Sequence, residues 1–169
     1  MTSTELLYAL KEFTEETLKE LKLPVRLQQS DSKQPEDRTP TVYLMRVPDS
    51  LSSTKKAPYI LHQKVTGSDM QNPGRRTDST CTVRSVFCIY HPDEQEGALT
   101  LNECMERMRI ALLKTRVLAQ QFEIIMTDGN NPQSLIYPDN KAPYFVGEML
   151  TTWSLPPIER EGTMYEPYI

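Results

Sequence analysis

The sequence predicts an α+β domain in which an antiparallel or mixed β-sheet packs against two main helices. Apolar residues recur at the helical period in two separate stretches, near the N-terminus and between residues 100 and 113. Three longer runs, 58–65, 80–90 and 144–155, are rich in β-branched and aromatic residues and have the pattern of strands. The order helix, strand, hairpin, helix, strands and tail is typical of a two-layer domain.

Length and charge limit what this domain can be. At 169 residues the chain is long enough for one domain with a real core, which we place at residues 1–155, followed by a C-terminal arm at 156–169. The formal net charge of −4 argues against a protein built to coat nucleic acid. No apolar run approaches the ~20 residues that span a bilayer, and the N-terminus lacks the pattern of a secretory signal. We therefore expect no membrane partner and a cytoplasmic start.

The first helix is amphipathic and is expected to run from Thr2 to just before Pro24. Thr2 and Glu5 have the form of a capping box, and the residue before a proline is disfavoured in a helix. Its apolar face consists of Leu6, Leu7, Leu10, Phe13, Thr17, Leu18 and Leu21. After it, residues 28–40 are polar and contain two prolines, which indicates a surface linker. Residues 41–47 then form a short strand, closed by Pro48, near a sheet edge.

The two longer strands that follow, 58–65 and 80–90, predict a β-hairpin with a long mobile loop at 66–79. This loop is well above the usual two to five residues, and loops of that kind are usually functional or disordered. Both faces of the second strand carry apolar side chains. Such a strand is central in its sheet or is covered by a partner chain.

A second helix is expected to open with a capping box formed by Thr100 and Glu103. Its apolar stripe consists of Leu101, Cys104, Met105, Met108, Ala111 and Leu112. Short strands are expected at 122–126 and 134–137, and a long one at 144–155, which Pro156 and Pro157 end. Trp153 shares a face of this strand with Phe145, Gly147, Met149 and Thr151, so we expect a core tryptophan under the helices.

The chain lacks the usual signatures of catalysis. It contains no phosphate-binding glycine loop and no nucleophile elbow. His62 and His91 are the only histidines, and without a partner at ligand spacing a surface or interface role is favoured over a general base or a metal ligand. The sequence positions of Cys81 and Cys88 differ by an odd number, so in a regular strand their side chains lie on opposite faces of the sheet. We expect no enzyme, no cofactor and no metal site.

The 66–79 loop and the C-terminal arm supply the candidate interaction residues. Arg75 and Arg76 could contact phosphate, although Asp69 and Asp78 make the loop neutral. A loop that orders against another protein fits equally well, and Met70 suits such an adaptable contact. In the arm, aromatic side chains suggest docking, either on a neighbouring subunit or on the same chain. These side chains are Tyr165 and Tyr168.

Three segments together resemble a known family. The first, Ala57-Pro58-Tyr59-Ile60-Leu61-His62-Gln63, opens a strand that leads to the long hairpin. The second is Asp93-Glu94-Gln95-Glu96-Gly97 followed by the helix Cys104-Met105-Glu106-Arg107-Met108-Arg109-Ile110-Ala111-Leu112-Leu113. The third is Tyr144-Phe145-Val146-Gly147-Glu148-Met149 before Trp153-Ser154-Leu155-Pro156. Over residues 41–160 this arrangement resembles the tail terminator, or tail completion, proteins of tailed bacteriophages, especially those of Gram-positive hosts.

The resemblance implies a structural virion protein at the head-proximal end of the tail. In that family a hexameric ring caps the tail tube, stops its polymerisation and offers a docking face to the neck. The implied partners are copies of the same chain, the tail tube protein, a neck or head-completion protein, and sheath protein if the tail is contractile, with genomic DNA only passing through the lumen. The 66–79 loop would reach a tube subunit or the channel. A head-closure or connector protein of the same particle is the main alternative, followed by a small enzyme or nucleic-acid-binding domain.

Overall fold

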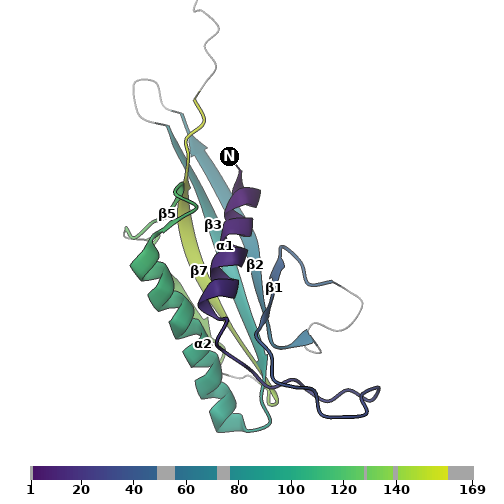
Figure 1. Ribbon diagram of the computed structural model, residues 1–169. Helices are drawn as coiled ribbons and strands as arrows, with labels where there is room; N and C mark the ends of the chain where they lie inside the picture. Colours follow the sequence, from purple (N-terminus) through teal and green to yellow (C-terminus); the bar gives the residue numbers. More distant parts are fainter. Residues whose placement is uncertain (1, 49–55, 72–76, 128, 139–140, 160–169) are drawn as a thin grey trace, which may run out of the picture.

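The computed structural model describes residues 2–48, 56–71, 77–127, 129–138 and 141–159, and it confirms the predicted α+β class (Figure 1). Over these residues two helices lie on one face of a seven-stranded mixed sheet. The helices are α1 (Ser3–Thr17) and α2 (Glu94–Thr115). The strands are β1 (Thr41–Leu44), β2 (Tyr59–Met70), β3 (Asp78–Tyr90), β4 (Val117–Leu118), β5 (Phe122–Ile124), β6 (Gln133–Ile136) and β7 (Tyr144–Leu155).

The strand order explains the apolar character of the longest strands. The sheet runs β1-β2-β3-β7-β5-β4, and β6 also pairs with β7. β1 is parallel to β2, whereas the other pairs are antiparallel. β3 therefore lies in the centre, as its two apolar faces predicted, and β1 lies at the edge. No helix among the described residues is long and apolar enough to cross a membrane.

α1 begins as predicted but ends earlier. The Thr2 side chain accepts from the Glu5 N–H while the Glu5 side chain accepts from the Thr2 N–H, which completes the capping box. The helix stops at Thr17 rather than next to Pro24. Leu18, Leu21 and Leu23 nevertheless remain buried, because the chain after the helix continues to cover the same core.

α2 begins earlier than predicted, so the capping box proposed at Thr100 is wrong. Its N-cap is Asp93, whose carboxylate oxygen accepts from the N–H groups of Gln95 and Glu96 at 3.0 and 2.8 Å. Gly97 lies in the first turns against Phe145, where a Cβ atom would come within 2.2 Å of the ring carbon Cε2. Gly97 is thus a close-packing position inside the helix.

The core lies between the helices and one face of β2, β3 and β7. Trp153 is completely buried there, which confirms its predicted place, and its indole N–H donates to Thr151 Oγ1 at 2.9 Å. Cys81 belongs to this core, whereas Cys88 belongs to a smaller apolar cluster on the opposite face. The predicted separation of these two cysteines is therefore confirmed.

The linker at 28–40 is mostly exposed and contains no helix or strand beyond a bridge between Leu23 and Arg38. One residue fastens its end to the sheet. The Arg38 guanidinium donates to the Thr41 side chain at 2.8 Å and to the carbonyl oxygens of Pro58 and Lys56, both at 2.9 Å. Partial burial lowers the pKa of Arg38.

The hairpin differs from the prediction in where its strands end. β2 continues to Met70 and β3 begins at Asp78, so half of the predicted 66–79 loop consists of paired strand residues. The pairing continues because Thr66, Ser68, Ser79 and Thr80 are compatible with strands, and polar composition alone had indicated a loop.

Candidate protein-interaction site

The upper half of β2, from Lys64 to Met70, is the most exposed strand segment of the described sheet. Every residue in it is exposed, whereas the four residues that begin β2, Tyr59–His62, are all buried. β1 pairs only with those first four residues. Beyond them β2 has β3 as its single described strand neighbour, and Figure 1 shows the hairpin extending past the N-terminus of α1.

Apolar side chains are exposed on and beside this segment. Val65 is 52 % exposed, Met70 is 54 % exposed, and Ile158 is 59 % exposed. The chain after β7 runs along the hairpin, because the Gln71 side-chain amide donates to the Ile158 carbonyl oxygen at 2.9 Å. Asp69 accepts from the Ser79 hydroxyl at 2.6 Å and so ties the two strands together.

The structure describes one of the predicted interaction residues. Met70 ends β2 with its side chain in solvent, where a partner can reach it. Arg75, Arg76, Tyr165 and Tyr168 lie outside the described residues. Those four assignments remain predictions from the sequence.

The sheet face opposite the helices carries a second, half-buried apolar surface. Tyr59, Leu61 and Cys88 are buried there, and the Tyr43 and Tyr59 rings meet edge to face with centroids 6.0 Å apart. Leu135 on β6 is 50 % exposed. It lines a hollow of about 240 Å³ together with residues of β6 and β7, which are Gln133, Ser134, Glu148 and Leu150.

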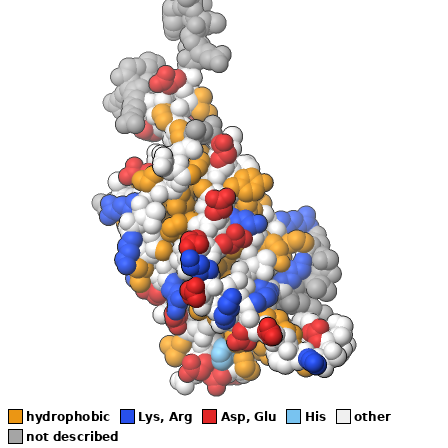
Figure 2. Space-filling model, viewed as in Figure 1, with side chains coloured by type: hydrophobic (Ala, Val, Ile, Leu, Met, Phe, Trp, Pro, Cys, Tyr) orange, Lys and Arg blue, Asp and Glu red, His pale blue; other side chains and the backbone are white. Residues whose placement is uncertain are grey.

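The helix-bearing side has a different character. Figure 2 shows positive and negative side chains interspersed over it, without a large area of one sign. On α2, Arg107 pairs with Glu103 and Arg109 pairs with Glu106, each at 2.7 Å. Exposed pairs of this kind contribute little to stability, and they give a surface that remains well hydrated.

His62 is completely buried and is not the surface histidine that the sequence suggested. Its Nε2 lies 2.8 Å from Thr14 Oγ1 on α1, and its Nδ1 lies 2.7 Å from Ser85 Oγ on β3. Thr14 donates its own proton to the Leu10 carbonyl oxygen at 2.7 Å, so His62 Nε2 must be the donor to Thr14. Nδ1 then accepts from the Ser85 hydroxyl, and a neutral imidazole satisfies every group.

Burial lowers the pKa of His62 to about 4, in agreement with this arrangement. A proton on Nδ1 would face Ser85 Oγ and displace the hydrogen bond that this hydroxyl donates. The three side chains therefore act as a neutral polar link between α1 and the central strands. Spacing in the sequence could not reveal it, because the partners of His62 come from two other elements.

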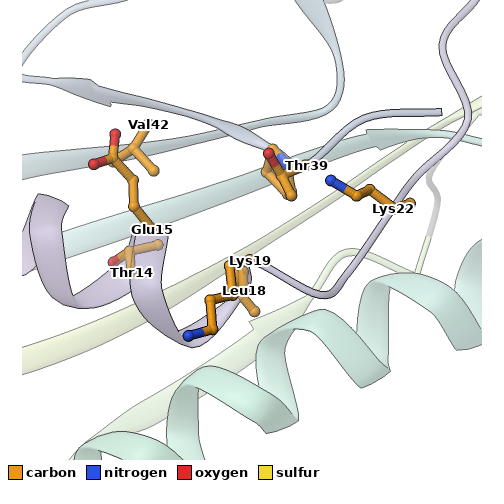
Figure 3. Close-up of a pocket in the computed structure, with 8 residues that line it drawn as sticks. Thr14, Glu15, Leu18, Lys19, Lys22, Thr39 and Val42 are labelled. Carbon is orange, nitrogen blue, oxygen red and sulfur yellow. The ribbon is translucent and has the colours of Figure 1, made fainter. Parts of the chain in front are cut away.

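A hollow of about 300 Å³ lies between the end of α1 and β1 (Figure 3). Thr14, Leu18, Thr39, Pro40 and Val42 line it together with three charged residues, Glu15, Lys19 and Lys22. Figure 3 shows Glu15 and Lys22 on opposite sides of this space. The charged groups do not converge on one point, so the hollow has no evident chemistry.

The cysteines are equally inert. All three are buried and free, and burial raises the pKa of Cys88 to about 11 and that of Cys104 to about 12. Thiols of this kind remain protonated near neutral pH. Within the described part of the chain, no group of three His, Cys, Asp or Glu side chains is placed to hold a metal ion.

Comparison with known proteins adds no identity: no protein-family model matches the chain, and no curated protein is detectably similar to it.

Proposed function

We propose that this chain is a structural subunit of a bacteriophage tail, in which six copies form a ring on the head-proximal end of the tail tube. The ring ends polymerisation of the tube and gives the neck a docking face. The role is mechanical and needs no reaction. What supports the proposal is the resemblance of three sequence segments to tail terminator proteins, together with an α+β fold of the class that the resemblance implies.

The observation that carries the proposal is the exposed upper half of β2. Of the seven residues from Lys64 to Met70, all but Val65 at a bulge pair with β3, although their side chains are in solvent. A strand with so little burial contributes few apolar contacts to the domain, and an exposed strand edge is a template for another chain. We assign this segment to the contact with the tube.

Copies in a closed ring meet through two different surfaces on each chain. The chain has such surfaces on its two sheet edges and on its two sheet faces, of which one carries both helices of the described residues. A net charge of −4 suits a wall past which DNA must slide without being held. The remaining proposed partners are a neck or head-completion protein and, in a contractile tail, the sheath. The chain would assemble in the host cytoplasm and remain in the virion.

The test is binding to isolated tail tubes. The purified chain should bind one end of each tube and form a six-fold ring there, as seen by electron microscopy. Met70→Asp should abolish this binding, because it places a charge in the tube contact. The matched control is Leu99→Asp on α2, where the native side chain is 61 % exposed, and this variant should bind normally. Binding to isolated heads instead of tubes would contradict the proposal and indicate a head-closure protein.

A further inference from the structure

We propose that the outer edges of β1 and β6 pair between neighbouring copies and join their sheets, through an antiparallel junction, into one continuous mixed sheet. This inference rests on the ring proposed above and names the contact that closes it. β1 and β6 lie on opposite sides of the sheet, and no described strand pairs with the outer edge of either. Two different open edges are what a head-to-tail ring requires.

The two edges lie at the same level of the sheet. Val42 on β1 is connected to Ile136 on β6 by successive paired residues across the sheet, which are Ile60, Phe87 and Gly147. Leu44 likewise leads to His62, Ser85, Met149 and Ser134. A rotation about an axis along the strands, without any shift, therefore brings β1 of one copy beside β6 of the next.

The strand directions also fit. β1 is parallel to β2, and β3, β7 and β6 each reverse direction in turn, so β6 runs opposite to β1. Copies related by such a rotation keep their strand directions. The junction is then antiparallel, with Val42 opposite Ile136 and Leu44 opposite Ser134.

The outward backbone groups match as well. Thr41 donates its N–H to the Pro58 carbonyl oxygen just before β2, and Met45 donates to that of His62, so the groups of Val42 and the N–H of Leu44 point away from β2. The Leu44 carbonyl oxygen also points away and accepts from the Arg46 N–H at 2.7 Å, which leaves its second lone pair for a neighbouring copy. Tyr137 donates to the Val146 carbonyl oxygen, so the groups of Ile136 and Ser134 point away from β7. The outward-facing residues thus fall opposite each other, as a hydrogen-bonded antiparallel pair requires.

Within the strands themselves neither edge carries a charged residue or a proline, although both strands are short and prolines flank them at positions 40, 48, 132 and 138. β1 reads Thr-Val-Tyr-Leu and β6 reads Gln-Ser-Leu-Ile, so each has four residues and neither contains a charge or a proline. Isolated proteins commonly place lysine or proline on such edges to prevent association. By contrast, the β4–β5 edge carries Glu123 and follows Arg116.

The size of the resulting ring is a direct consequence. At this level each copy contributes five strands, β1, β2, β3, β7 and β6. At about 4.8 Å a strand, six copies give a backbone diameter of about 46 Å for upright strands, the arrangement in which neighbouring copies meet without a shift.

Cysteine cross-linking tests the register. Thr41 and Tyr137 are at the same level of the sheet, because successive strand pairings connect them. They lie on opposite edges of one chain, about 19 Å apart, so a disulfide between cysteines at these positions must join two copies. Tails assembled with Thr41→Cys/Tyr137→Cys and treated with an oxidant should give a ladder of cross-linked chains up to the hexamer. Thr41→Cys/Gln133→Cys is the control, because Gln133 lies four residues, about 13 Å, out of register.

A proline variant provides the second test. Ser134→Pro removes an outward N–H and leaves the pairing of β6 with β7 intact, so the melting temperature should hold while ring formation falls at least tenfold. Ser134→Ala keeps the N–H and should form rings normally. Normal rings that give no ladder, or that tolerate Ser134→Pro, would overturn edge pairing and leave the capping role standing. Absence of any ring on tubes would instead overturn both.

Discussion

The two halves of β2 share one strand and one partner, yet they differ in almost everything that stabilises a strand. Tyr59–His62 pair with β1 on one side and β3 on the other, and they are buried. Lys64–Met70 are exposed and, apart from the unpaired Val65 at a bulge, pair with β3 alone. Backbone pairing by itself therefore does not make a strand part of the core. The lower half maintains the fold, and the upper half is available for a partner.

The largest expected loss of stability comes from a substitution in the lower half of β2. Ile60 is 1 % exposed and lies in the main core between the helices and the sheet. Ile60→Ala should lower the free energy of unfolding by about 2–5 kcal/mol, because it removes buried methyl groups and leaves a cavity. Chemical denaturation followed by circular dichroism measures this change. A loss under 1 kcal/mol would mean that the lower half is not the stabilising half.

His62 makes the lower half sensitive to acid. Its pKa is about 4 in the folded chain and 6.5 when it is exposed, so the unfolded state binds the proton first as the pH falls. Its stabilising contribution is complete above pH 6.5 and is lost between pH 6.5 and 4, by about 3 kcal/mol in all.

The measurement is the slope of the free energy of unfolding against pH, compared between two proteins. Free energies of unfolding measured from pH 7.5 to 4.5 should fall more steeply for the native chain than for His62→Gln, which does not titrate. Gln can still donate to Thr14 and accept from Ser85. Equal slopes for the two proteins would show that the buried histidine is already protonated or exposed.

Amide hydrogen exchange separates the two halves without any substitution. Exposed strand residues with few apolar contacts open more readily than buried ones. Amides of β2 that donate to β3 above Lys64 should exchange at least tenfold faster than those between Tyr59 and His62. Mass spectrometry of peptides from each half gives this ratio, and equal protection would contradict the proposed division of the strand.

The smallest expected effect lies at the end of β2. Met70→Ser should change the free energy of unfolding by less than about 0.5 kcal/mol, because the Met70 side chain is 54 % exposed. The same variant should weaken binding to tube ends. A substantial loss of stability would show that Met70 packs within its own domain and is not reserved for a partner.

The sequence predicted best where one local pattern controls one element. The strand expected at 144–155 coincides with β7, and its alternation placed Trp153 under the helices. The sequence predicted less well where residue types alone were used to place the ends of a helix or a strand. Thr100 and Glu103 suggested a capping box although α2 already begins at Glu94, after its N-cap Asp93. The polar hairpin residues suggested a loop although pairing with β3 keeps them extended.

Features that join distant segments could not be predicted from local patterns. The His62 link draws Thr14 from α1 and Ser85 from β3, and only the folded sheet brings them together. The matching edges depend on four successive strand registers, from β1 through to β6. No short window of the sequence contains that information.

We propose that this chain stops the growth of a tail tube, and the length of assembled tubes tests this role. Particles assembled without the chain should contain tubes that are abnormally long and variable, as seen by electron microscopy. Adding the native chain during assembly should restore a single length. Tubes of normal, uniform length in its absence would contradict the account.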